Sequence, residues 1–160
     1  MLQHRLEPTA NFLMQTMGFR WIGEEHGWHR YALGQGQSGQ VLEIRADSSE
    51  HNGRLGKGVI HHLAWRVADD AAELAVRARL ALAQRQPTPV IDRFWFKSVY
   101  FREPGGAVFE IATDGPGFAV DEPNETLGER LMLPPWLEIR RSEIEGVLPK
   151  LKMPTVKPFE

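Results

Sequence analysis

The sequence contains no cysteine. Disulfide bonds, catalytic thiolates and zinc sites built from thiolates are therefore excluded. Any metal that this chain binds must take nitrogen and oxygen ligands, so the search for a site is a search among histidines and carboxylates.

Two further absences narrow the class of protein. The chain has no excess of basic residues, because 19 Lys and Arg stand against 21 Asp and Glu, so nothing favours nucleic-acid binding. No run approaches the roughly 18 apolar residues of a membrane span, and the first residues lack the apolar core of a signal peptide. The remaining composition, 42% apolar over 160 residues, is that of a globular protein. We expect a soluble, cytoplasmic protein that binds neither nucleic acid nor membranes.

Periodicity and turn residues predict two similar halves. The first half reads as a helix and three strands, and the second reads as a strand, a helix and three strands. Along the helix of the second half, Leu74, Ala78, Ala81 and Leu82 fall on one side. The expected helices cover residues 8–17, 70–84 and 142–147, and the expected strands cover residues 19–22, 28–33, 41–46, 59–67, 89–92, 97–102 and 107–113.

A short internal match indicates a duplication. Residues 41–47 (VLEIRAD) match residues 108–114 (VFEIATD) at the same place in each half, which makes Glu43 the counterpart of Glu110. We interpret the chain as an α+β fold of paired βαβββ modules, residues 1–57 and 58–115, followed by a C-terminal arm, residues 116–160, packed on the domain. The strand that should open the first module would begin before Met1, so we expect the first module to lack most of its first strand. We expect that it has been lost or that a neighbouring chain replaces it, which predicts a homodimer.

Strand alternation selects the candidate site residues. On the strand at 59–67, His62 shares a face with Ala64 and Arg66, whereas His61 falls on the face that the helix should cover. Glu110 lies mid-strand between apolar neighbours and needs a partner, because a buried carboxylate is costly unless it is paired or metal-bound. From the residues alone a salt bridge to Arg102 would also satisfy it. Tyr100 shares a face with Arg102 on the preceding strand.

The motifs GVIHHLAWRV and YFREPGGAVFEIATDGPGF, placed at the start and end of the second module, resemble the vicinal oxygen chelate superfamily of glyoxalases, fosfomycin-resistance enzymes and extradiol dioxygenases. The later stretch DEPNETLGERLMLPPWLEIRRSEIEGVLPKL is similar to the C-terminal half of ring-cleaving dioxygenases that act on hydroquinone-type substrates, and the similarity runs over residues 7–151. The resemblance implies a curved sheet around a divalent metal.

The resemblance also implies roles for particular residues. His62 and Glu110 match the metal ligands, with His61 as the second reading of the doubled histidine, and Tyr100 matches a tyrosine that contacts the aromatic hydroxyl. The implied metal is Fe(II), with Mn, Zn or Ni as alternatives, and the implied partners are a small aromatic substrate and O₂. The other histidine ligand of such enzymes comes from an earlier unit, so the chain would associate with a missing N-terminal half or with a copy of itself.

Besides a ring-cleaving dioxygenase, the sequence leaves two other functions open. A glyoxalase-like isomerase would add Glu43 to His62 and Glu110 and would use Ni or Zn. A non-catalytic module would only bind a small ligand. If the dioxygenase reading holds, Arg102 or Arg66 is available to stabilise anionic intermediates.

Overall fold

The computed structural model describes residues 1–49 and 56–150 and divides the chain into two compact units, Met1–Gly117 and Phe118–Glu160. Residues 50–55, near the end of the predicted first module, and residues 151–160 of the predicted arm lie outside the described residues. The first unit holds both predicted modules. The packing of the arm on the domain remains a prediction.

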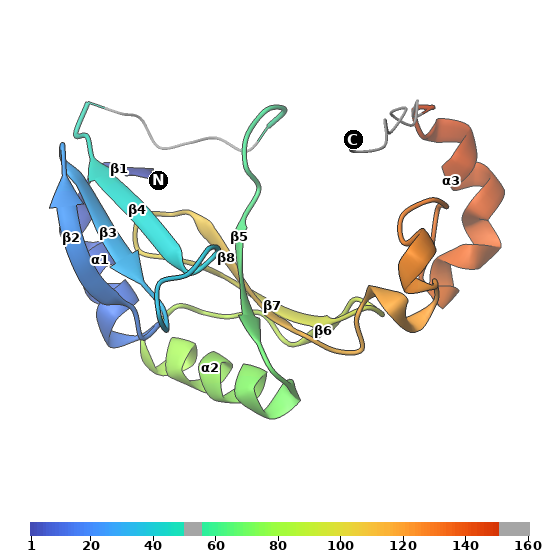
Figure 1. Cartoon of the computed structure of the whole chain (residues 1–160), viewed down its shortest axis with the longest axis horizontal. Coiled ribbons are helices and arrows are strands. Elements are labelled where there is room, and N and C mark those ends of the chain that lie inside the picture. The colour runs from blue at the N-terminus through green and yellow to red at the C-terminus, as the bar shows by residue number, and fades with distance from the viewer. Residues whose placement is uncertain (50–55, 151–160) are drawn as a thin grey trace, which may run out of the picture. The chain divides into compact units, whose positions relative to one another are not determined.

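Each module of the first unit forms a four-stranded mixed sheet with one helix against it (Figure 1). The strand orders, β1-β4-β3-β2 and β5-β8-β7-β6, are the same arrangement repeated, which confirms the predicted α+β fold. The first module consists of β1 (Leu2–Gln3), α1 (Leu6–Gln15), β2 (Arg20–Glu25), β3 (Trp28–Ala32) and β4 (Val41–Ala46); the second consists of β5 (Leu63–Val67), α2 (Asp70–Leu82), β6 (Ile91–Asp92), β7 (Lys97–Arg102) and β8 (Val108–Thr113).

The first strand of the first module is short, as the sequence predicted. β1 pairs in parallel with β4 over two residues, whereas β5 pairs in parallel with β8 over five. The two pairings end in the same way: the amide of Asp47 donates to the carbonyl of Gln3, and the amide of Asp114 donates to the carbonyl of Val67. The internal repeat is therefore a repeat of structure.

The two modules share one hydrophobic core. Phe12 of α1 meets Phe101 of β7 edge to face, with ring centroids 5.8 Å apart. Phe19 packs in the same way on Trp65 of β5, and Trp65 on Phe109 of β8. Aromatic rings in such geometry contribute packing area and an additional attraction. Neither module is independent of the other.

A buried carboxylate reinforces this junction. Glu103, in the turn between β7 and β8, is 2% exposed and accepts hydrogen bonds from the side chains of Gln3 and Thr9 in the first module. It also accepts the backbone amides of Gly105 and Ala107. Four donors offset the cost of burying the charge.

The sequence prediction was wrong about one helix face. Leu74 and Leu82 of α2 are 53% and 85% exposed, whereas Glu73 and Leu80 are buried. The helix begins where predicted, because the side chain of Asp69 caps the amide of Ala72. The face that meets the sheet is the one that carries Glu73 and Leu80, so the Leu/Ala side is directed to solvent.

The strand predicted over residues 59–67 is also shorter than expected. β5 begins at Leu63, because the ladder with β8 starts at the pair Leu63–Phe109. Gly58 precedes this segment with φ +84°, a conformation that suits a turn rather than a strand. His61 and His62 consequently lie just ahead of the strand.

The second unit contains short helices. Its described elements are η1 (Phe118–Val120), η2 (Asn124–Thr126), η3 (Pro135–Arg140) and α3 (Arg141–Val147), the last close to the predicted helix at 142–147. Arg141 is held by Glu138 and Glu145 on either side of it. Over the residues that the structure describes, no helix is long and apolar enough to cross a membrane.

Candidate metal centre

The ladder of the second sheet places three predicted site residues together. Glu110 of β8 stands directly opposite Tyr100 of β7 on one side and Ala64 of β5 on the other. His62 lies just ahead of β5, and its side chain reaches Glu110. The order β5-β8-β7 thus brings together side chains that are up to 48 residues apart in sequence.

Glu110 has a partner for each carboxylate oxygen. The side chain is 4% exposed, with Oε2 lying 2.7 Å from His62 Nε2 and Oε1 accepting a hydrogen bond from the Tyr100 hydroxyl at 2.7 Å. The imidazole of His62 and the ring of Tyr100 also meet edge to face. These contacts offset the free-energy cost of burying a carboxylate. Glu110 is not paired with Arg102, the alternative partner that the sequence allowed.

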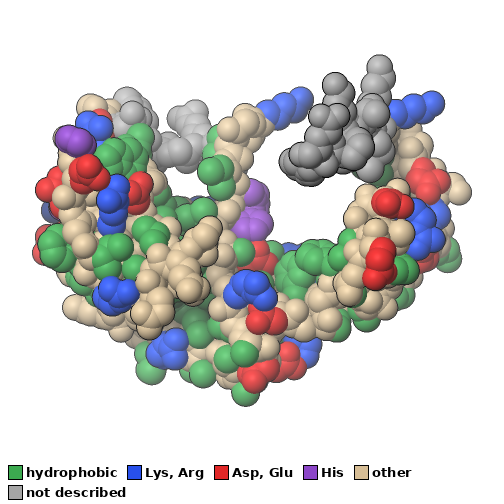
Figure 2. Space-filling view, viewed as in Figure 1, with side chains coloured by type: hydrophobic (Ala, Val, Ile, Leu, Met, Phe, Trp, Pro, Cys, Tyr) green, Lys and Arg blue, Asp and Glu red, His purple; other side chains and the backbone are tan. Residues whose placement is uncertain are grey.

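The doubled histidine is a contact pair. The Nδ1 atoms of His61 and His62 lie 2.8 Å apart, so one ring donates a hydrogen and the other accepts it. His61 is exposed, which contradicts its predicted place on the core side; the strand begins only after it, so strand alternation does not apply there. Figure 2 shows histidine side chains at the surface beside β5. His62 itself is one-third exposed and therefore accessible to a ligand.

Arg93 joins the site although the sequence analysis did not single it out. Its guanidinium carbon lies 5.4 Å from the centroid of the Tyr100 ring, within the range of a cation–π contact, and its Nε lies 3.4 Å from Ser98 Oγ. The β6–β7 hairpin brings it there, since the Arg93 amide bonds the Phe96 carbonyl. The local sequence pattern carried no signal for this contact, because it depends on the register of the hairpin.

The two arginines that were expected to stabilise anionic intermediates have other partners. Arg102 donates to the carbonyl of Gly106 in its own hairpin, and Arg66 forms an ion pair with Asp114. Neither contacts Tyr100 or Glu110 in any hydrogen bond or ion pair of the described residues.

Glu43 forms an ion pair within the first module and is not part of the second-module contact set. It stands opposite Arg30 in the β3–β4 ladder and binds the Arg30 guanidinium, which also holds Glu25. The hydrogen bond to Glu43 raises the pKa of Arg30. Arg30 thus occupies the position that Tyr100 occupies in the second module.

The donor set fits part of a divalent metal site. An imidazole nitrogen and a carboxylate oxygen in contact are two of the three ligands of a 2-His-1-carboxylate set, and the same atoms suit Mn, Ni and Zn. No group of three or more His, Asp or Glu side chains close enough to hold a metal occurs within residues 1–49 and 56–150. Among the described residues, His62 and Glu110 are therefore two candidate ligands without a third beside them.

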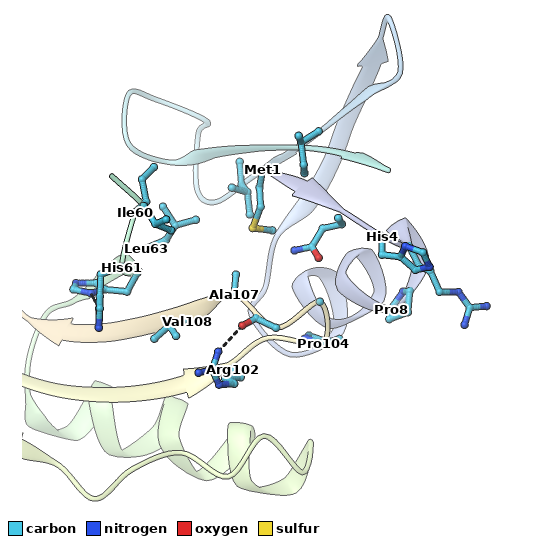
Figure 3. A pocket seen from close by; sticks show the side chains of 18 residues that line it. Met1, His4, Pro8, Ile60, His61, Leu63, Arg102, Pro104, Ala107 and Val108 are labelled. Atoms are coloured by element: carbon cyan, nitrogen blue, oxygen red, sulfur yellow. Dashed lines mark hydrogen bonds between the residues drawn. The ribbon is translucent and has the colours of Figure 1, made fainter. Parts of the chain in front are cut away.

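A cavity of about 790 Å³ borders the doubled histidine. His61 and His62 line it together with Arg102 and with apolar side chains from both modules, and Figure 3 shows Met1 on one side of it with Ile60, Leu63 and Ala107 across from it.

No family model matches the chain. Curated proteins do match it. MhqO of Bacillus subtilis (strain 168), a candidate ring-cleaving dioxygenase, is 42% identical over 150 residues, which are 93% of this chain and 47% of MhqO. The chlorohydroquinone/hydroquinone 1,2-dioxygenase of Sphingobium indicum is 33% identical over 144 residues, which are 88% of this chain and 44% of that enzyme. The chain thus spans about half the length of the curated relatives it matches.

Solved structures agree with the sequence comparison. The crystal structure of a candidate dioxygenase from Bacillus subtilis subsp. subtilis str. 168 superposes with a TM-score of 0.85 at 40% identity, covering 95% of this chain and 48% of that one. A glyoxylase/bleomycin resistance protein/dioxygenase domain from Frankia sp. EAN1pec superposes with a TM-score of 0.61 at 15% identity, covering 72% of this chain and 88% of that domain. The second likeness concerns the fold alone.

Proposed function

The chain belongs to the vicinal oxygen chelate (glyoxalase/dioxygenase) superfamily and is homologous to ring-cleaving dioxygenases over about half of their length. We propose that it supplies two metal ligands of a ring-cleaving dioxygenase for hydroquinone- or catechol-like aromatics. The observation that carries the proposal is the contact set His62–Glu110–Tyr100 on one face of the second sheet. The Sphingobium relative, a chlorohydroquinone/hydroquinone 1,2-dioxygenase, supports the substrate class.

His62 and Glu110 are the residues that would hold the metal. Fe(II), or Mn(II), bound there would supply Lewis acidity toward a phenolic hydroxyl and redox chemistry with O₂. The chain's own groups then prepare the site: Glu110 supplies a carboxylate oxygen beside His62, and His61 fixes the ring orientation of His62 through the contact between their Nδ1 atoms.

Tyr100 and Arg93 would position the substrate. The Tyr100 hydroxyl holds a proton at the edge of the Glu110 carboxylate and can offer it to a substrate oxygen that arrives beside Glu110. Arg93 lies over the Tyr100 ring, and its fixed positive charge favours negative charge on a bound phenolate. These roles replace those first considered for Arg102 and Arg66.

The third protein ligand would come from outside these residues. Relatives of twice the length contain further sequence that this chain does not match. The register of β1 puts the counterpart of His62 ahead of Met1, so His4, which follows β1, does not occupy that position. Activity therefore requires another polypeptide segment or another copy of this chain.

The Arg30–Glu43 pair weighs against the isomerase alternative. That reading requires Glu43 as a ligand, and the guanidinium already neutralises it. The identity of the bound metal distinguishes a dioxygenase from an isomerase, since ring cleavage requires a redox-active metal whereas the isomerases use Ni or Zn.

The test combines metal analysis with oxygen uptake. Purified protein loaded anaerobically with Fe(II) is analysed for bound metal and assayed with substituted hydroquinones and catechols, alone and mixed with the half of a relative that this chain does not match. Glu110→Gln and Glu43→Gln form a matched pair, one from each module. We expect metal retention and uptake to be lost only in Glu110→Gln; equal effects of the two, or no metal and no uptake under any condition, would refute the proposal.

A further inference from the structure

The outward face of α2 is apolar. It consists of six exposed side chains, Ala71, Leu74, Ala75, Ala78, Ala81 and Leu82. Figure 1 shows α2 lying along one side of the second sheet, and a helix in that place usually directs charged residues to solvent and apolar residues to the sheet. In α2 the carboxylate of Glu73 is buried, whereas Leu82 is 85% exposed. A contiguous exposed apolar face of this kind is typical of an interaction surface.

Charged side chains lie only along the edges of this face. At about 100° per residue, Ala78 lies at its centre, with Leu74 about 40° to one side and Leu82 about 40° to the other. Asp70 and Arg79 lie about 80° and 100° from the centre, on opposite sides. A partner that packs on Ala78 would therefore meet apolar side chains first.

The pattern of large and small residues on this face is complementary to itself. Leu74 and Leu82 are each four residues from Ala78, one before it and one after it. A second copy of α2 that ran antiparallel, related by a two-fold axis at Ala78, would place each Leu74 level with Leu82 of the other copy. Because the two leucines lie on opposite sides of the centre line, they would pack side by side, and the small side chain on the axis would allow a close approach of the helices.

The charges of α2 favour the antiparallel direction. Asp69 and Asp70 stand at the start of the helix, and Arg85 follows its end. In the two-fold register Asp70 lies level with Gln86 of the second copy, next to Arg85, so each acidic end meets a basic end. A parallel copy would bring like charges and like ends of the helix dipoles together. The two Arg79 side chains would lie along the same edge of the pair and limit its affinity.

We propose that two copies of this chain associate through α2, antiparallel, with Ala78 at the two-fold axis and with Leu74 and Leu82 as the main contacts. The self-complementary pattern and the opposite charges at the two ends both indicate a second copy as the occupant. A single helix pair buries less than the roughly 1,600 Å² of a standard interface, so we expect a weak dimer that forms with rising protein concentration.

The dimer leaves the candidate metal centre open. Ile111 of β8 belongs to the core cluster that also contains Leu80 of α2. Side chains alternate along a strand, so the neighbouring Glu110 is directed to the other face of the sheet, where it meets Tyr100. The proposal is therefore independent of the proposed dioxygenase function, and either one can fail without the other.

The first experiment uses the lack of cysteine in this chain. Ala78→Cys places one thiol on the proposed axis, where helix axes about 9 Å apart would hold the two Cα atoms about 4–5 Å apart, a separation that suits a disulfide. Ala71→Cys is the matched control on the same face, because its two copies would lie about 21 Å apart along the antiparallel pair. We expect disulfide-linked dimers, measured on non-reducing gels after mild oxidation, to form at least about tenfold faster in Ala78→Cys.

The second experiment measures association of the full chain by sedimentation equilibrium. Leu82→Gln removes a main contact from both copies, and Leu127→Gln is the control, since Leu127 is an exposed leucine of the second unit. We expect the association constant to fall at least about tenfold in Leu82→Gln and to stay at the wild-type value in Leu127→Gln. Circular dichroism checks that both variants are folded.

Three results would overturn the proposal. Equal rates of cross-linking in the two cysteine variants would mean random encounter or a parallel pair. A wild-type chain that stays monomeric up to about 1 mM, the weakest affinity of interest here, would exclude association through α2. A dimer that Leu82→Gln and Leu127→Gln weaken equally, or that neither weakens, would have to use another surface.

Discussion

Tyr100 donates a hydrogen bond to Glu110 across the β7–β8 ladder, at the position where the first module has Arg30 opposite Glu43. The two carboxylates occupy the same place in a repeated structure, so the partner determines what each can do. A phenol leaves the charge of Glu110 available to a cation, whereas the Arg30 guanidinium neutralises Glu43. The repeat has therefore diverged into one candidate site and one structural ion pair.

The first prediction separates the two adjacent histidines. His62→Ala removes the nitrogen that contacts Glu110, and we expect Mn(II) affinity to fall by more than about 100-fold. His61→Ala removes only the partner of the His62 Nδ1 atom, and a loss of about 10–100-fold is expected, as for other groups that orient a ligand. Titration calorimetry measures both affinities. The reverse order of effects would make His61 the ligand and His62 its orienting partner.

The second prediction concerns the Tyr100 hydroxyl. Tyr100→Phe keeps the ring and removes the donor to Glu110, so metal affinity should change little while ring cleavage by the completed enzyme falls by about 100-fold or more. Tyr31→Phe is the control, because Tyr31 is the other tyrosine and is buried in the shared core. Steady-state oxygen uptake gives both values. Activity of Tyr100→Phe equal to that of Tyr31→Phe would exclude a role for the hydroxyl in the reaction.

The sequence alone was sufficient to predict the repeated architecture. The strands at 41–46 and 97–102 have the predicted bounds, because alternation and the turns that follow them mark both ends. Alternation also predicted that His62, Tyr100 and Glu110 would meet, and they do, although His62 lies just ahead of β5.

Three features could not be predicted, and each depends on contacts between elements. The start of β5 at Leu63 is set by where its ladder with β8 begins. The exposed Leu74 could not be distinguished from a buried one, because α2 carries apolar residues on two sides and the sheet selects one. Arg93 reaches Tyr100 only through the hairpin between β6 and β7. Local patterns contain none of this information.

The third prediction concerns the junction between the modules. A Cβ atom on Gly105 would lie 1.7 Å from Gln3 Oε1, so Gly105→Ala must displace Gln3 from Glu103. We expect the free energy of unfolding to fall by about 1–3 kcal/mol. Gly56→Ala is the control, because no atom of the described residues lies within 4 Å of its Cβ position. Urea unfolding measures both, and equal stability of the two variants would contradict the tight fit at Gly105.

The fourth prediction follows from Glu73, whose side chain is buried against the second sheet with both carboxylate oxygens lacking a hydrogen-bond partner in the described part of the chain. Burial raises the pKa of Glu73 above its ordinary 4.5; Asp70 adds to the rise, and Lys97 opposes it. The folded state therefore holds the Glu73 proton at a pH where the unfolded chain has released it. The contribution of Glu73 to stability is complete below about pH 4.5 and is lost as pH rises through the folded pKa.

Replacing Glu73 with an unbranched apolar side chain removes this loss of stability at higher pH. We expect Glu73→Met to increase the free energy of unfolding at pH 7 by about 1–3 kcal/mol, because the unsatisfied carboxylate is gone, and to increase it less at pH 4, where wild-type Glu73 is protonated in both states. Glu7→Met, at an exposed position of α1, should change stability by less than about 0.5 kcal/mol at either pH. Urea unfolding at the two pH values provides the comparison. A gain in Glu73→Met that is the same at pH 4 and pH 7 would attribute the effect to packing alone and would refute the titration of Glu73 as its cause.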